Sequence, residues 1–288
     1  MIYITTSVSL MRYDPATDRV ETVCRPRKSL GFFGVCQGPD GVYAASRERL
    51  SEQTLGKASS DVRLYRVVSN TGIAEEVREL YEVHDVHQME YHDGLLFLTD
   101  TALDRVHVYE LATNRLVRII NLGPQRRDTH HVNAVLMEGE NLLVGLNNRG
   151  HRDSAILTLP MEAIRNGGPV EVDGFGMGPL RELTGIHHTH DLERYKDWLL
   201  CCASHAGQVL RTDTGEVIAH TEGWTRGLAV TDEGLWVGVS PLAKRSQRHK
   251  SNLDGKLLLF RHGDFDLLRE IPLEGSGQVC DLLYSPVG

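Results

Sequence analysis

Short apolar runs of about five residues alternate with turn sequences along most of the chain, and long stretches with helical periodicity are nearly absent. Residues 74–81 and 161–166 are the most helix-like segments, and both are short. This pattern predicts an all-β protein in which most strands are connected by tight turns.

A unit of two strands joined by a tight turn recurs six times. The copies begin at Phe32, Asp85, His130, His187, Trp224 and Gly277. Their spacing, roughly 37 to 57 residues, fits the four-stranded blades of a β-propeller. Further alternating segments follow each unit as outer strands, and residues 170–175 are expected to form the outer strand of the third blade.

The sixth copy ends with the chain at Gly288, but residues 2–24 contain the strands that it lacks. We therefore predict a six-bladed β-propeller in which N- and C-terminal strands together close the last blade. Closure of this kind removes the sheet edges that an open repeat would expose. The whole chain, residues 1–288, is expected to form one domain.

Composition narrows the classes of partner. The net charge of −8 argues against nucleic acid or an anionic membrane as a partner held by overall electrostatics. No segment approaches the roughly 18 apolar residues that span a bilayer, and the first residues lack the basic region and small-residue cleavage site expected of a secretory signal. Five cysteines without a CxxC pair indicate neither a disulfide framework nor a zinc knuckle. We expect a cytoplasmic, reduced protein.

Histidines gather where three consecutive inner strands begin, next to the central channel. Because side chains alternate along a strand, residues two apart face the same way. This alternation predicts inward pairs at the six strand starts: Asp85/His87, His131/Asn133, His188/His190, Trp224/Arg226, Gln278/Cys280 and Gly34/Cys36. A register slip would bring in His130, His187 or His84 instead.

Neutral imidazoles on one rim are suitable ligands for zinc, iron(II) or copper. The candidate metal ligands are His87, His131, His188 and His190. The second ring N–H groups could bond to nearby carboxylates, namely Asp85, Glu90, Asp191 and Glu193. The alternative is that the histidines are structural and hydrogen-bond to one another across the channel.

Three further residues complete the candidate site. Arg226 would orient a carboxylate or phosphate of a substrate, and Asp85 and Asn133 are candidate catalytic residues. Cys36 and Cys280 lie on neighbouring blades and could approach each other. Long loops at residues 46–60, 147–153 and 240–255 are expected to wall the channel mouth. The last of these carries basic residues that suit a solvated loop or an anionic substrate: Lys244, Arg245, Arg248, His249 and Lys250.

The segments GWTRGLAVTDEGLWVGVS, HVNAV and HDLERYKDWLL resemble a family of bacterial six-bladed propellers with no established activity. More distantly, the chain is similar to lactonase and gluconolactonase propellers, whose channel binds calcium through Glu, Asn and Asp. That resemblance implies Asn133 and Asp281 as two of the ligands. The blade that should supply the Glu lacks it, and histidines surround the site, so calcium is disfavoured. The histidine ring is more similar to that of iron or copper propeller oxygenases and oxidases, which have seven blades and usually four ligands.

Two functions are consistent with these residues. The first is a metal-dependent enzyme acting on a small anionic organic molecule at the channel mouth, by oxidation with iron or copper and by hydrolysis or a lyase step with zinc. The second is a non-catalytic propeller that binds a ligand or a protein. No GxSxG, P-loop or HExxH motif is present, so nucleophile-elbow, nucleotide and zincin chemistry are unsupported.

Overall fold

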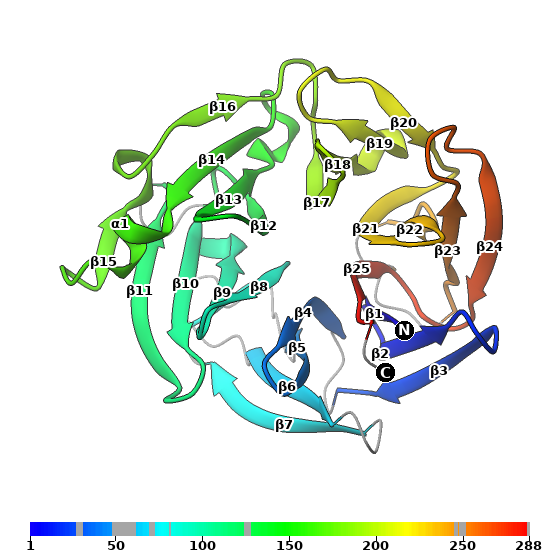
Figure 1. The fold of residues 1–288 in the computed structure, drawn as a ribbon, viewed down its shortest axis with the longest axis horizontal. Coiled ribbons are helices and arrows are strands. Elements are labelled where there is room, and N and C mark those ends of the chain that lie inside the picture. Colours follow the sequence, from blue (N-terminus) through cyan, green and yellow to red (C-terminus); the bar gives the residue numbers. More distant parts are fainter. Residues whose placement is uncertain are drawn as a thin grey trace.

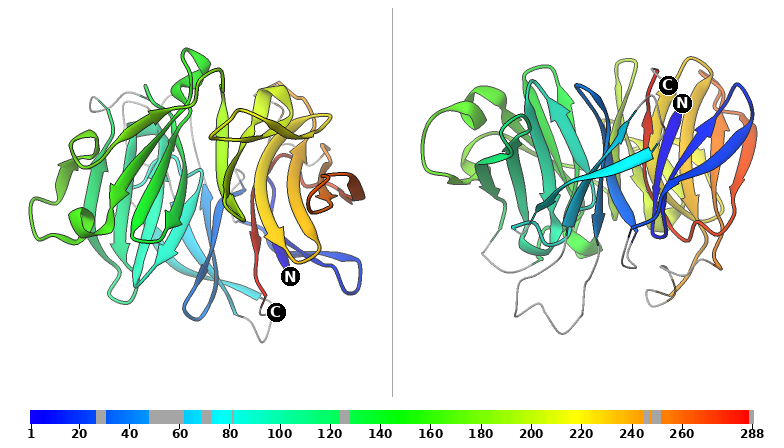
Figure 2. Two further views of the ribbon diagram at one scale, coloured as in Figure 1. Left: turned by 45° about the horizontal axis from the view of Figure 1, so that its top comes forward. Right: turned by 90° about the horizontal axis from the view of Figure 1, so that it is seen from below.

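Six antiparallel sheets surround a central axis in the computed structural model of the chain (Figure 1). The structure describes residues 1–26, 31–47, 62–68, 73–80, 82–123, 128–244, 247 and 252–286. In side view the blades stand next to one another, and their strands run between the two faces of the ring (Figure 2). The predicted six-bladed β-propeller is confirmed.

The first three blades follow the chain from the inside of the ring outward. Blade 1 contains β4 (Phe32–Gly38), β5 (Gly41–Arg47), β6 (Val62–Val68) and β7 (Ile73–Leu80). Blade 2 contains β8 (Met89–His92), β9 (Leu95–Asp100), β10 (Arg105–Glu110) and β11 (Arg115–Asn121). Blade 3 contains β12 (Val132–Glu138), β13 (Asn141–Leu146), β14 (Ala155–Pro160) and β16 (Leu180–Glu182).

Blades 4 and 5 have the same order. Blade 4 contains β17 (Thr189–Tyr195), β18 (Trp198–Ala203), β19 (Gln208–Arg211) and β20 (Val217–His220). Blade 5 contains β21 (Trp224–Thr231), β22 (Gly234–Ser240), β23 (Gly255–Phe260) and β24 (Leu267–Leu273).

Blade 6 joins the two ends of the chain, as the sequence predicts. Its inner strand is the C-terminal β25 (Val279–Tyr284), followed by β1 (Ile2–Thr6), β2 (Leu10–Asp14) and β3 (Arg19–Cys24). The α-amino group of Met1 donates to the carbonyl of Ser285 at 3.0 Å, which fixes the seam.

One predicted element differs from the structure, and one ambiguous segment is decided by it. Residues 74–80 belong to β7, which pairs with β6 as the outer edge of blade 1, so the outer strand indicated by the alternation of residues 76–80 is confirmed and their helix-like pattern does not form a helix. Residues 171–173 form β15 (Glu171–Asp173), which pairs in parallel with β11 of blade 2 and not with blade 3. The helix expected near residue 161 is confirmed as α1 (Met161–Arg165). Among the described residues, no helix is long and apolar enough to cross a membrane.

The β15 segment is held by a buried arginine. Arg118 on β11 is 3% exposed, and its guanidinium donates to one carbonyl at the end of α1, that of Ile164, and to two in the segment that follows, those of Asn166 and Pro169. These bonds satisfy the hydrogen-bonding groups of both the guanidinium and the carbonyls. The segment between β14 and β16, which leaves blade 3, is thereby attached to the edge of blade 2.

Apolar side chains fill the spaces between the blades. The buried residues of the described chain form six clusters, and each cluster joins two neighbouring blades. Trp236, for example, packs with Tyr13 across the junction of blades 5 and 6, with ring centroids 5.4 Å apart. The inner strands are thereby held rigidly around the axis.

Polar side chains near the end of the second strand also connect the blades. Each donates a hydrogen bond to the carbonyl of the first or second residue of the next inner strand: Thr5 to Phe33, Thr101 to Val132, Asn147 to Thr189, Ser204 to Thr225 and Ser240 to Val279. These bonds fix the position of each strand start, where the candidate site residues lie.

Candidate functional site

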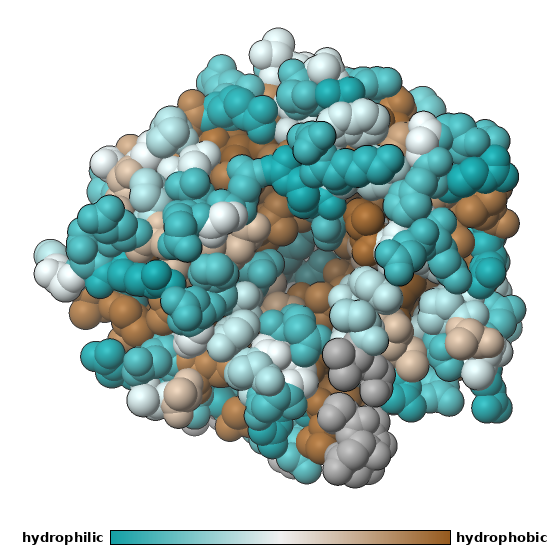
Figure 3. Space-filling model, viewed as in Figure 1, coloured by the Kyte–Doolittle hydropathy of each residue, from teal (hydrophilic) through white to brown (hydrophobic). Residues whose placement is uncertain are grey.

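A cavity opens at the centre of the ring, where the space-filling view is hollowed and polar (Figure 3). It has a volume of about 270 Å³ including its open mouth. Every blade contributes to its lining, which consists of Phe33, His87, Gln88, Asn133, His190, Asp191, Arg226, Cys280 and Asp281.

In five of the six inner strands, a residue at a β-bulge lines the cavity. The pairing between first and second strands shifts at Phe33, Asn133, Asp191, at Arg226 with the following glycine, and at Cys280. A bulged residue leaves the ladder and its side chain is re-aimed, here toward the axis. The strict alternation predicted from the sequence is therefore wrong at several positions. Adjacent residues both line the cavity in blades 2, 4 and 6, and Phe33 replaces the predicted Gly34 and Cys36.

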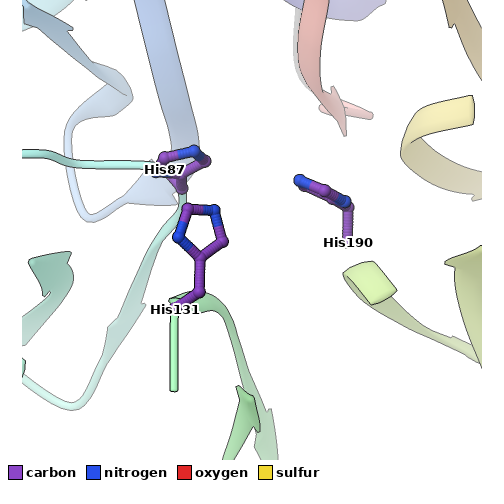
Figure 4. Close-up of side chains that lie close together, drawn as sticks. All are labelled: His87, His131 and His190. Carbon is purple, nitrogen blue, oxygen red and sulfur yellow. The ribbon is translucent and has the colours of Figure 1, made fainter. Parts of the chain in front are cut away.

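The structure brings together three of the four predicted ligand histidines. One ring nitrogen from each of His87, His131 and His190 lies within 4.8 Å of one from each of the other two. His87 and His131 are neighbours, with ring centroids 5.4 Å apart, and His190 faces them from blade 4 (Figure 4). They are the only such group of potential metal ligands in the described part of the chain.

Hydrogen bonds fix the tautomers of two rings. The hydroxyl of Thr101 donates its one proton to the carbonyl of Val132, so it accepts from His87 Nδ1 at 2.8 Å. Ser204 likewise donates to the carbonyl of Thr225 and accepts from His190 Nδ1 at 2.9 Å. Both rings therefore carry hydrogen on Nδ1, and the lone pair available to a ligand is on Nε2.

The third ring has the same tautomer for a different reason. His131 Nδ1 lies 2.9 Å from the carboxylate of Asp128, which can only accept. The loop that contains His131 is held by Asp104, whose side chain accepts from the main-chain N–H groups of Thr129, His130 and His131 at 2.6, 3.0 and 2.8 Å. His131 has a positive φ of 52°, a strained conformation for this residue type, which these bonds maintain.

Burial keeps two of the ligands neutral. It lowers the pKa of His87 well below its usual value, and the nearby Arg47 guanidinium adds to the effect. Burial also lowers the pKa of His190, followed by the positive charge of Arg226. Neutral imidazole is the form that binds metals, so these rings need no deprotonation at pH 7.

His188 lies outside the group of three. Its ring stacks on that of His205, with centroids 4.0 Å apart, and His205 stacks in turn on Trp224. The main chain of Gly150 also lies close to the His188 ring, since a Cβ added to Gly150 would come within 2.1 Å of Cε1. His188 and Trp224 are thus part of an aromatic stack on the rim.

The three alternative histidines also have other partners. His130 Nδ1 contacts the side chains of Asn148 and Arg152. His187 lies beside Asp153, and His84 Nδ1 contacts Asp100 at 3.1 Å. None of the three belongs to the group formed by His87, His131 and His190.

Of the carboxylates expected beside the histidines, only Asp85 lies there. It forms an ion pair with Arg47, whose guanidinium covers the Phe33 ring, and is 3.6 Å from His87 Nδ1. The expectation is wrong for Glu90 and Glu193, which come three residues after a histidine and so about 10 Å further along the strand. Their carboxylates have no hydrogen bond to the three rings in the described structure.

Asp191 also has a different role from the one expected. Together with Asp281 and Gln88 it forms the floor of the cavity. The Gln88 amide donates to Asp191 at 2.5 Å and approaches Asp281 at 3.5 Å. Main-chain N–H groups of Leu228, Val35 and Leu282 also bond to the two carboxylates. Burial raises the pKa of both carboxyl groups.

This floor does not match a calcium site. The oxygens of Asp281 already accept hydrogen bonds, and the nearest cluster of ligand atoms consists of imidazole nitrogens. Calcium prefers six to eight oxygen ligands. The calcium ligands implied by the resemblance to lactonase propellers therefore do not fit the donor set of this chain.

Arg226, Asn133 and Cys280 line the cavity as predicted. Cys280 and Cys36 are both free thiols, and burial raises the pKa of Cys280 to about 12, so it is protonated. Of the loops expected at the mouth, most of residues 46–60 lies outside the described residues, as do Arg245, Arg248, His249 and Lys250.

Sequence reasoning missed the residues that orient the rings. Thr101 and Ser204 follow the second strands of their blades, at positions where other copies have Asn147 or Ser240. A small polar residue recurs there in most units, and alignment of the copies could have identified it. Asp104, Asp128 and Arg47 carry no repeated signal, because each occurs in only one copy of the repeated unit.

No protein-family model and no curated protein matches the chain. Several solved structures are similar to the chain. The periplasmic gluconolactonase of Pseudomonas aeruginosa is 13% identical over all of both chains, with a TM-score of 0.63. A chain of a nidogen/laminin complex is 10% identical over 98% of this chain and 96% of its own, with a TM-score of 0.65. A candidate 6-phosphogluconolactonase from Bacteroides fragilis is 11% identical over 93% and 80%, with a TM-score of 0.60. At these identities the likeness shows the propeller fold, and the fold alone does not choose a function.

Proposed function

We propose that this chain is a metal-dependent enzyme that acts on a small anionic molecule at the mouth of the propeller channel. The observation that supports it is the set of three histidines whose Nδ1 atoms all donate to fixed acceptors. Their Nε2 lone pairs remain for a common ligand. Metal-binding histidines are typically oriented in this way.

The donor set favours a transition metal. Three neutral nitrogens suit zinc, iron(II) or copper, and leave coordination positions free for water or substrate. When bound, such a metal supplies Lewis-acid chemistry, or redox chemistry in the case of iron or copper. His87, His131 and His190 would hold it, and Arg226 would bind the anionic group of the substrate.

Catalysis can be distinguished from binding alone. Two of the solved structures are named as gluconolactonases or their 6-phospho relatives, so the test panel should contain sugar lactones as well as small organic acids. We would load the protein with zinc, iron(II) or copper and follow each mixture by NMR. Loss of a substrate and appearance of a product, absent for His190→Ala, would support the enzyme. Ligand shifts without turnover across the panel would favour the non-catalytic binding protein.

A further inference from the structure

Two polar side chains in the cavity lack protein partners. Arg226 has no carboxylate partner among the described residues, and its Nε is buried without an acceptor. Asn133 is 3% exposed, and within the described chain neither its amide oxygen nor its amide nitrogen has a hydrogen-bond partner. Both residues line the same cavity as His87 and His190.

The two arginines that are less than 9% exposed in the described chain both have charged or carbonyl partners. Arg47, in the same channel, pairs with Asp85, and Arg118 donates to three carbonyls. A buried charge or amide without a partner destabilises a fold, so such groups are typical of functional sites. The charge balance also calls for an anion. A divalent metal on three neutral imidazoles would add to the positive charge of Arg226, and the floor carboxylates are engaged by Gln88.

We infer that the substrate is a small carboxylate with a second oxygen on the adjacent carbon, a 2-hydroxy or 2-oxo acid; this inference rests on the proposed function. The planar fork of Arg226 matches the two oxygens of one carboxylate. The Asn133 amide can donate to the second oxygen and accept from it when it is a hydroxyl. The same pair of oxygens can chelate a metal held by the histidines.

The test is calorimetric titration of the zinc-loaded protein with glycolate, acetate and inorganic phosphate. Glycolate and acetate carry the same charge and differ by the hydroxyl. We expect glycolate to bind at least tenfold more tightly than acetate. Equal affinities for the two, or tighter binding of phosphate than of glycolate, would overturn the inference.

Variants separate the two contacts. Arg226→Met should weaken glycolate and acetate alike, by 30-fold or more, while Asn133→Leu should remove the preference for glycolate and leave acetate binding nearly unchanged. Arg261→Gln, on the outer surface, is the matched control and should behave as the wild type. Arg226→Met should fold well, because it removes a half-buried charge that no described carboxylate pairs. Unchanged glycolate affinity in folded Arg226→Met would refute the assignment.

Metal content, measured on each sample first, separates failure of this inference from failure of the proposed function. If zinc is bound but the acids are not distinguished, the substrate class is wrong and the metal site stands. If no zinc binds, the proposed function fails, and the same titrations on metal-free protein decide the anion site. Glycolate binding to the metal-free protein that is lost in Arg226→Met would support the anion site, and no such binding would overturn it.

Discussion

Removal of the Asp104 side chain should loosen the loop that carries one of the three histidines. Asp104 is fully buried and accepts three consecutive main-chain N–H groups, from Thr129, His130 and His131. In Asp104→Ala all three N–H groups lose their shared carboxylate acceptor. The strained φ of His131 then has no local support, so its ring should leave the orientation in which Nε2 faces the other two histidines.

The magnitude follows from the number of bonds. A hydrogen bond to a charged group contributes about 1.5–3 kcal/mol net, which sets an upper range of roughly 4.5–9 kcal/mol for three such bonds. The donor residues are partly exposed, so in the variant water can accept hydrogen bonds from these N–H groups and recover much of the lost energy. We therefore expect a loss of about 2–3 kcal/mol in the free energy of unfolding. Zinc affinity should fall by about 10- to 100-fold, as for other residues that orient a ligand.

Urea unfolding and competition titration with a zinc chelator measure the two effects. Asp128→Asn is the matched comparison, because it alters the partner of His131 Nδ1 and leaves the bonds of Asp104 intact. It should reduce zinc affinity with little change in stability. If Asp104→Ala binds zinc as tightly as the wild type, Asp104 does not position His131 and the reasoning is refuted.

Two further predictions concern the channel and the outer edge. Burial raises the pKa of Glu90 to about 8, so the folded state holds a proton that the unfolded state releases above pH 4.5. The free energy of unfolding of the wild type therefore falls as pH rises from 4.5 to 8. In urea unfolding, the stability of Glu90→Gln relative to the wild type should increase by up to about 1.4 kcal/mol per pH unit over that range. A stability difference that does not change with pH would contradict the raised pKa of Glu90. Arg118→Ala should lose about 3 kcal/mol in thermal unfolding, because three carbonyls lose their donor. A melting temperature equal to that of the wild type would show that the three hydrogen bonds of Arg118 contribute nothing to stability.

The ring of six blades could be predicted from the sequence because each blade repeats the same local pattern. Strand, turn and strand recur with polar punctuation, and the missing part of the last copy appears at the N-terminus as β1 to β3. The β15 segment could not be assigned correctly, since its alternation fits an outer strand of either blade. Its attachment to β11 depends on Arg118, whose partners are distant in sequence.

The site was predictable as a cluster but not in detail. His87, His131 and His190 stand at equivalent strand starts, so their proximity follows from the fold. The choice of His190 over His188 depends on a bulge at Asp191 and on the stacking of His188 against His205, neither of which alternation can reveal. Non-local bonds likewise determine that Asp191 belongs to the cavity floor.

Elemental analysis of untagged protein tests the proposed metal site most directly. It would be applied to the wild type, to His131→Ala and His190→Ala, and to His220→Ala as a control on an exposed strand. We expect about one zinc, iron or copper ion per chain in the wild type and the control, and almost none in the other two variants. A wild type that contains no such metal, and takes up none on incubation with each ion, would contradict the three-histidine metal site.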